Sequence, residues 1–294
     1  MRRFGRNTQH PRQGIQRRLG AAAFRWTVLA FAWAGGLESA SAAFEELAAD
    51  ARTAAMGSVS IASRGPESVL LNPAGIGGEG SGSACFSSAL PYGLKELAIH
   101  AFCAASSSRL GGLGLAVSTS GQTVYRETTF AVGWSTRFDG RVAAGVALRT
   151  LNLRIDRFGS WTGWALDAAV RIPLGGRWTF GFSGTNLNQA CVEKRSPVPQ
   201  TTCIGLLHVP FRNLILAAEI EKDARYPAGF HGGIEWTPFP GLALRWGFGL
   251  GPAQFAFGFG LDRNRFGLDY ACAVHPVLGA TQQATVRFHF RAGR

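Results

Sequence analysis

The chain has 294 residues, of which 46% are hydrophobic, 11% aromatic and only 16% charged, with 39 glycines and 21 phenylalanines. Few charges, many glycines and many aromatics without a long apolar run predict an all-β protein with many turns, folded as a single domain. Half of the net charge of +12 lies in residues 1–42, and the other basic residues are scattered, which argues against nucleic-acid binding.

Residues 1–42 are predicted to be a signal peptide. A basic region precedes an apolar stretch from Trp26 to Leu37, and Ala40-Ser41-Ala42 forms an A-x-A cleavage site. The apolar stretch is too short to cross a bilayer as a helix, and no later stretch reaches about 18 apolar residues. The alternative interpretation is a short buried helix, and a start codon assigned too early would explain the long basic region.

Residues 43–81 have neither the character of a signal nor that of a barrel. They contain an alanine-rich stretch in a helical pattern and end near Asn72-Pro73-Ala74-Gly75. Pro73 disfavours a helical conformation at Asn72, so the chain is expected to turn there. Small residues allow a backbone to pass close to a barrel wall. We therefore expect a short N-terminal plug in the barrel lumen, and the alternative is a segment that hangs from one end.

Residues 82–294 predict a transmembrane antiparallel β-barrel of about 14 strands. Segments of about ten residues alternate between a large apolar face and a face of Gly, Ala, Ser and Thr. A soluble sandwich would carry many charges on its second face. Short polar turns alternate with longer loops, which is the layout of outer-membrane barrels with short turns in the periplasm. The expected strands are 83–91, 94–104, 110–120, 126–138, 141–155, 161–174, 178–188, 200–210, 213–222, 229–239, 242–250, 254–262, 265–274 and 281–290.

Isolated charges on the small-residue face are expected to point into the lumen. They have two interpretations: wall residues in salt bridges that anchor the plug, or a polar path for a solute. The residues concerned are Arg149, Asp167, Arg171, Glu219, Glu221, Arg245, Arg287 and His289.

The five cysteines include no C-x-x-C pair, so neither a metal site nor a redox motif is expected. Cys191 and Cys203 flank one predicted loop and could pair in an oxidising compartment. The alternative is that they are small apolar residues of the barrel.

No catalytic signature is found. The chain lacks H-E-x-x-H, G-x-S-x-G and P-loop motifs, so we expect neither an enzyme nor a cofactor. Gly247, Gly249 and Gly251 alternate at strand spacing, unlike a phosphate-binding loop. They are interpreted as lumen-side residues that make room for another backbone.

Motifs at both ends of the predicted barrel resemble one family. The first, after Ala51-Arg52, consists of Met56-Gly57 and Asn72-Pro73-Ala74-Gly75, and the second consists of Asp269-Tyr270, His275-Pro276 and Gly279. Together they resemble PorV/PorQ-type outer-membrane proteins, within the FadL-like barrel superfamily. The chain departs from the family pattern at Ser58, where a second glycine is usual, at Gln282-Gln283, where a basic pair is common, and after Phe290.

The resemblance implies an integral protein of a Gram-negative-type outer membrane, in contact with its lipid and inserted by the barrel assembly machinery. PorV-like relatives serve type IX secretion, which would make secreted proteins or secretion-system components the partners. In FadL-like relatives a hydrophobic solute enters the barrel and the plug moves. Because the predicted lumen face is small and polar, we expect protein secretion or surface delivery. The alternatives are a channel for hydrophobic small molecules and a structural barrel without cargo.

Overall fold

A computed structural model describes residues 43–45, 49–77, 82–108, 110–139, 141–192 and 196–290. The predicted signal peptide, residues 1–42, lies outside this part of the chain. The described residues belong to one compact unit, Ser39–Arg294. No helix among them is long and apolar enough to cross a membrane.

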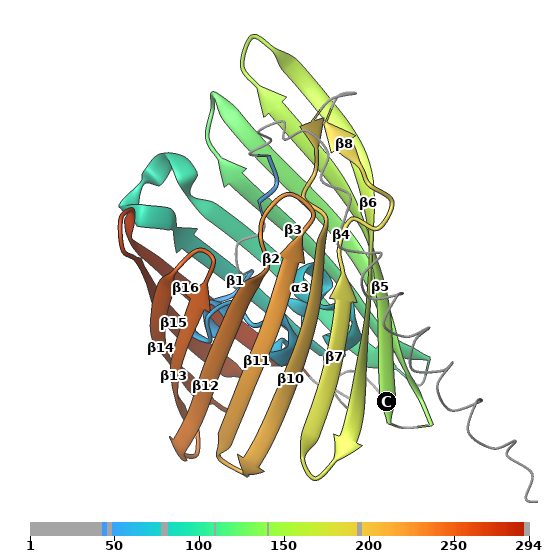
Figure 1. The fold of residues 1–294 in the computed structure, drawn as a ribbon, viewed down its shortest axis with the longest axis vertical. Coiled ribbons are helices and arrows are strands. Elements are labelled where there is room, and N and C mark those ends of the chain that lie inside the picture. The colour runs from blue at the N-terminus through green and yellow to red at the C-terminus, as the bar shows by residue number, and fades with distance from the viewer. Residues whose placement is uncertain are drawn as a thin grey trace, which may run out of the picture. The chain divides into compact units, whose positions relative to one another are not determined.

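Fourteen antiparallel strands form a closed barrel (Figure 1). The strands are β1 (Gly82–Leu90), β2 (Ile99–Ser108), β3 (Gly111–Gly121), β4 (Tyr125–Phe138), β5 (Val142–Ile155), β6 (Gly159–Gly175), β7 (Trp178–Gly184), β10 (Thr201–Phe211), β11 (Leu214–Asp223), β12 (Gly229–Phe239), β13 (Leu242–Leu250), β14 (Gln254–Arg263), β15 (Phe266–His275) and β16 (Gly279–Phe290). Each pairs with its neighbour in the chain, and β1 pairs with β16 from Gly82 opposite Phe290, which removes both open edges.

The predicted barrel is confirmed, and most strand ends agree within two residues. β2 begins at Ile99 rather than 94, because Pro91–Gly93 (η4) and Lys95–Leu97 (η5) form two short 3-10 helices. β7 ends at Gly184 rather than 188. A separate hairpin of β8 (Cys191–Val192) and β9 (Ser196–Pro197), which the sequence did not predict, lies between β7 and β10.

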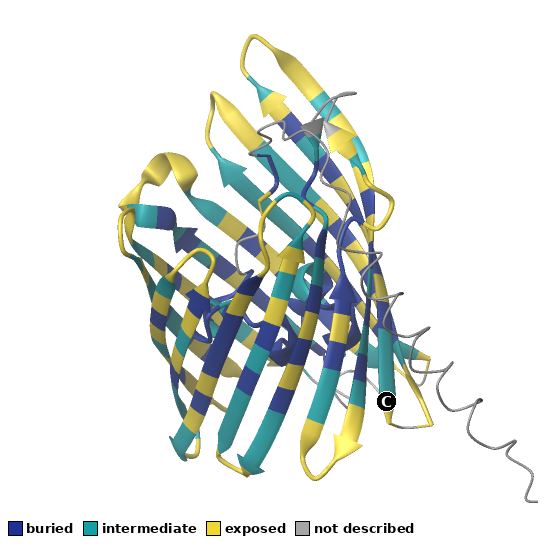
Figure 2. Cartoon of the chain, in the orientation of Figure 1, coloured by how far each residue is buried: buried dark blue, intermediate teal, exposed yellow. Residues whose placement is uncertain are grey.

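The strands alternate between exposed and buried residues, as Figure 2 shows. On β14, Phe255 and Phe257 are 69% and 51% exposed, whereas Ala256 between them is 4% exposed. Every barrel strand carries at least one exposed large apolar side chain on its outer face. A continuous apolar belt of this extent is unfavourable in water and favourable in hydrocarbon. The protein is therefore an integral barrel of the outer-membrane type.

Residues 49–77, here called the luminal segment, pack against the inner side of the barrel wall. They form α2 (Ala51–Ala55), η2 (Ser60–Ala62), α3 (Ser68–Leu71) and η3 (Pro73–Gly75), part of which is visible between the strands in Figure 1. Asp50 caps α2 by accepting a hydrogen bond from the Thr53 backbone N–H. Asn72 is extended, with φ −156°, immediately before Pro73, which confirms the predicted turn.

Candidate functional site

Glycines of the wall allow the luminal segment to approach it closely. A Cβ atom at Gly233 would lie 2.5 Å from the Met56 carbonyl oxygen, and one at Gly247 would overlap the backbone of Met56 and Gly57. On the other side of the barrel, a Cβ atom at Gly145 would overlap the backbone of Pro73. The predicted motif residues Met56, Gly57 and Pro73 thus contact the wall backbone to backbone, which glycine alone permits.

A chain of ion pairs joins the luminal segment to four strands, β12, β13, β15 and β16. Glu235 on β12 lies between Arg52, with Nε at 2.8 Å, and Arg245, with Nε at 2.6 Å. Arg245 Nη1 is 2.6 Å from Asp269 Oδ1, and Asp269 Oδ2 is 3.5 Å from Arg287 Nη1. All five side chains are at most 13% exposed. Each charge has an opposite partner, as burial of charged groups requires.

Arg287 continues the network back to the luminal segment. Its Nη2 lies 3.4 Å from Glu67 Oε1 and 3.7 Å from Asp50 Oδ2. Glu67 is fully buried ahead of α3. Burial raises the pKa of Glu67 to about 7, although the positive charge of Arg287 acts in the opposite direction. Glu67 therefore changes its charge near neutral pH inside a closed network.

Two further wall residues bind the backbone of the luminal segment. Glu219 accepts hydrogen bonds from Ser60 N at 3.1 Å, Ser60 Oγ at 2.9 Å and Ile61 N at 2.9 Å. Arg171 donates from Nη1 to the Ser63 carbonyl at 2.9 Å. These side chains fix η2 and the residues after it against β6 and β11.

The remaining predicted lumen charges lie elsewhere. Arg149 and Asp167 form a buried pair at 2.8 Å, and Asp167 also accepts from Asn186 N at 2.8 Å, which fixes the turn after β7. Glu221 lies 3.9 Å from the Cys203 thiol, at the outer end of β11.

The residues of the predicted last-hairpin motif have separate roles. Asp269 belongs to the ion-pair network, whereas Tyr270 packs against Phe259 with ring centroids 5.7 Å apart. His275 Nδ1 accepts hydrogen bonds from the Val277 and Leu278 backbone in the β15–β16 loop, which also contains Pro276, and Gly279 begins β16. The structure thus brings only Asp269 of this motif to the luminal segment.

The cysteines are arranged differently from the predicted pairing. Cys191 is an exposed free thiol in β8, so no disulfide joins it to Cys203, which faces the lumen in β10. Cys203, Glu219 and Glu221 place ligand atoms within 4.8 Å of one another. However, both Glu219 oxygens already accept hydrogen bonds from the luminal segment, so a metal would have to displace them. Cys85 and Cys103, which the sequence analysis did not connect, are directly opposite on β1 and β2.

Several central residues were missed in the sequence. Glu235, Glu67 and Asp50 complete the ion-pair network, and Glu127 accepts a hydrogen bond from the Phe44 backbone at 2.9 Å. Glu235 stands between two outward apolar residues of its strand, Ile234 and Trp236. This alternation was the signal that could have identified it as an inward charge.

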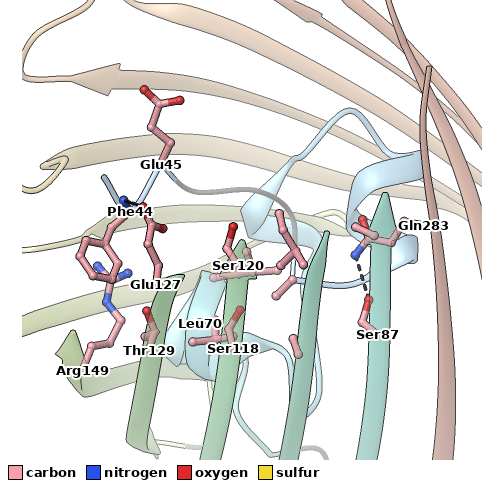
Figure 3. A pocket seen from close by; sticks show the side chains of 15 residues that line it. Phe44, Glu45, Leu70, Ser87, Ser118, Ser120, Glu127, Thr129, Arg149 and Gln283 are labelled. Carbon is pink, nitrogen blue, oxygen red and sulfur yellow. Dashed lines mark hydrogen bonds between the residues drawn. The ribbon is translucent and has the colours of Figure 1, made fainter. Parts of the chain in front are cut away.

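An outer chamber lies on the long-loop side of the luminal segment (Figure 3). Its volume is about 110 Å³. Leu70 and Leu71 of the luminal segment and Phe44 and Ile99 supply apolar surface. The polar part of the lining consists of Glu45, Ser87, Ser118, Ser120, Glu127, Thr129, Arg149 and Gln283. The chamber therefore offers a mixed surface suited to a small molecule with an apolar body.

An inner chamber lies on the short-turn side of the same segment. Its volume is about 590 Å³. Residues 64–66 and 74–77 of the luminal segment contribute Arg64, Gly65, Pro66, Ala74, Gly75 and Gly77 to its lining. The wall contributes basic residues of β4, β6 and β16 and Arg141 of the short turn between β4 and β5. The luminal segment thus borders both chambers and lies between them.

No family model matches the chain, and no curated protein sequence matches it. Solved structures with a similar fold include the CymD monoaromatic hydrocarbon channel, at a TM-score of 0.64 and 10% identity over 86% of this chain and 100% of that one. The Pseudomonas putida toluene transporter TodX has a TM-score of 0.59 and 13% identity, over 84% of this chain and 98% of that one. A Pseudomonas aeruginosa FadL homologue has a TM-score of 0.59 and 9% identity, over 86% of this chain and 100% of that one. The chain therefore shares the fold of FadL-type barrels, and the finer PorV/PorQ resemblance stays a prediction.

Proposed function

We propose that the protein is a non-enzymatic outer-membrane channel for small, largely apolar molecules, with the luminal segment as its gate. The observation that carries this proposal is the position of the luminal segment between the two chambers. Leu70 and Leu71 border the outer chamber, while Arg64 and Pro66 border the inner one. A solute in the outer chamber would reach the periplasmic side when this segment moves.

The class of solute is inferred from two sources. The outer chamber combines leucine, isoleucine and phenylalanine side chains with hydroxyl and amide groups, which is typical of sites for small organic molecules. The barrels with a similar fold are described as a monoaromatic hydrocarbon channel and a toluene transporter, which favours an apolar solute over a sugar or an ion. A role in protein secretion is supported by the sequence resemblance alone, because chambers of about 110 and 590 Å³ have no room for a folded protein.

Uptake by intact cells would test the proposal. Cells that lack other hydrocarbon channels would receive the wild-type gene, an empty vector, or a variant with a blocked outer chamber. Ser118→Trp places a large ring in the chamber, and Val117→Trp is the matched control, because the neighbouring residue points to the opposite face of β3.

We expect radiolabelled toluene to enter wild-type and Val117→Trp cells faster than vector cells, and Ser118→Trp cells at the vector rate. Radiolabelled glucose should show no such difference. Equal toluene uptake in wild-type and vector cells would refute the proposal. Unchanged uptake by a correctly inserted Ser118→Trp barrel would show that the outer chamber is not on the path.

A further inference from the structure

The lining of the inner chamber is rich in basic residues. Among the described residues, the lining contains five arginines and one histidine and no aspartate or glutamate: Arg64, Arg137, Arg141, Arg171, Arg287 and His289. Arg287 is paired with Asp50, Glu67 and Asp269 of the ion-pair network. The basic side chains around the chamber favour the approach of an anion.

Arg171 is the most informative of these residues. It is 6% exposed, and its Nη1 donates to the Ser63 carbonyl at 2.9 Å. Its Nη2 is buried without a hydrogen-bond partner among the described residues. Within the same part of the chain, no carboxylate lies within 4.0 Å of Arg171. A buried guanidinium with an unused donor is costly unless an acceptor occupies the space beside it.

Arg64 faces the same space from the luminal segment. Its side chain borders the chamber and has no carboxylate within 4.0 Å in the described residues. Although the residue as a whole is exposed, partial burial of its guanidinium group, together with the positive charges of Arg52 and Arg137, lowers the pKa of Arg64. An anion in the chamber can therefore reach the Arg64 side chain, and it would offset these neighbouring positive charges.

We propose that the inner chamber is a binding site for an oxyanion, a carboxylate or phosphate group, held by Arg171 and Arg64. The guanidinium group presents paired N–H donors in a plane, which match the two oxygens of a carboxylate or phosphate. The volume of about 590 Å³ accommodates such a group together with an attached organic portion or water. The anion site does not depend on the proposed passage of apolar solutes, because binding would occur whether or not the segment moves.

The group could come from a free inorganic anion or from the acidic head of an amphipathic solute. Isothermal titration calorimetry of the full-length barrel in a neutral detergent at low ionic strength would distinguish them. One arm uses sodium phosphate, a second uses sodium octanoate, and a third uses octanoate in the presence of saturating phosphate. Sodium chloride titrated over the same ionic strength provides the baseline.

The variants are Arg171→Gln and Arg64→Gln, with Arg263→Gln as the matched control. Arg263 is an exposed arginine at the end of β14, beside another short turn. Arg64→Gln leaves the Arg171 contact with Ser63 intact, so it tests the site even if Arg171→Gln disturbs folding. Migration on gels before and after boiling would show that each barrel is folded.

We expect saturable binding of at least one probe, weakened at least tenfold by Arg171→Gln and by Arg64→Gln, and changed less than twofold by Arg263→Gln. Octanoate that competes with phosphate would identify a shared site for acidic solutes, and binding of phosphate alone would identify a free anion. Absence of saturable binding by wild-type protein would overturn the proposal, as would affinities unchanged in both folded variants. Neither result would bear on toluene uptake.

Discussion

Arg52 of the luminal segment and Glu235 of β12 meet through two parallel hydrogen bonds, although 183 residues separate them in the chain. Arg52 Nε donates to Oε2 at 2.8 Å and Nη2 donates to Oε1 at 3.0 Å. Arg52 Nη1 also donates to the Ala62 carbonyl at 2.8 Å, so one side chain joins α2, η2 and the wall. Such a fork fixes orientation as well as distance.

The first prediction concerns this fork. Arg52→Gln removes one of the two cations beside buried Glu235, and loss of one partner of a buried pair typically costs about 3–5 kcal/mol. Because Arg245 still pairs with Glu235, we expect a loss of stability at the lower end, about 3 kcal/mol. This loss should be measured as faster hydrogen exchange at residues 51–62. Arg157→Gln is the control, since Arg157 is 91% exposed and 3.9 Å from Asp156. Unchanged exchange in Arg52→Gln would contradict the anchoring role.

The second prediction concerns Glu219. Glu219→Gln has the same shape, but its amide nitrogen cannot accept a hydrogen bond, so it cannot satisfy all three donors of Ser60 and Ile61. We expect the stability of this part of the luminal segment to fall by about 1.5–3 kcal/mol, which is the typical contribution of a hydrogen bond to a charged group. Exchange of the Ser60 and Ile61 amides should accelerate. Glu221→Gln, on the same face of β11, should leave both amides protected, and equal effects of the two substitutions would argue against a specific anchor.

The barrel itself could be predicted from the sequence because period-2 alternation is a local property. The two faces of β14 can be identified from the alternation of Phe255, Ala256 and Phe257 alone, without knowledge of any partner strand. The turns before β2 could not be placed, because the sequence marks the interruption at Pro91 but does not show how far it extends.

The site was only partly predictable for a different reason. Alternation shows that Arg245 and Arg287 point inward, but it does not show which residues of the luminal segment lie opposite them. The partners Asp50 and Glu67 are distant in the chain, and their contacts depend on how the segment folds inside the barrel. The small lumen face was interpreted as favouring protein secretion. The structure instead shows that glycines such as Gly233 and Gly247 accommodate the luminal segment.

The third prediction uses this close approach. Gly247→Ala would place a methyl group on the backbone of Met56 and Gly57, which cannot yield without displacement of the segment. We expect a leakier barrel, measured as faster swelling of proteoliposomes in arabinose. Gly249→Ala is the control two residues along the same strand, because its Cβ atom would meet only side-chain atoms of Gln254 and His231, at 3.2 Å or more. Identical swelling rates for both variants would show that the segment does not close the lumen.

The last prediction concerns pH. Burial is the main reason why the pKa of Glu67 is raised from an ordinary value of 4.5 to about 7. Between pH 4.5 and pH 7, Glu67 therefore carries a proton in the folded protein that it has lost in the unfolded chain. The stabilisation from Glu67 is therefore complete below about pH 4.5 and is lost as the pH rises through 7. At 1.36 kcal/mol for each pKa unit, the loss is about 3 kcal/mol by pH 8.

Glu67→Gln cannot ionise, so this component should be absent from its pH dependence. Urea unfolding of the detergent-solubilised barrel at pH 5 and pH 8 would measure the free energies. From pH 5 to pH 8, the free energy of unfolding of the wild type should fall by about 3 kcal/mol relative to that of Glu67→Gln. Glu96→Gln, in the exposed 3-10 helix η5, is the control and should behave as wild type. Parallel pH profiles for wild type and Glu67→Gln would mean that Arg287 keeps Glu67 ionised throughout, and that the network does not respond to pH.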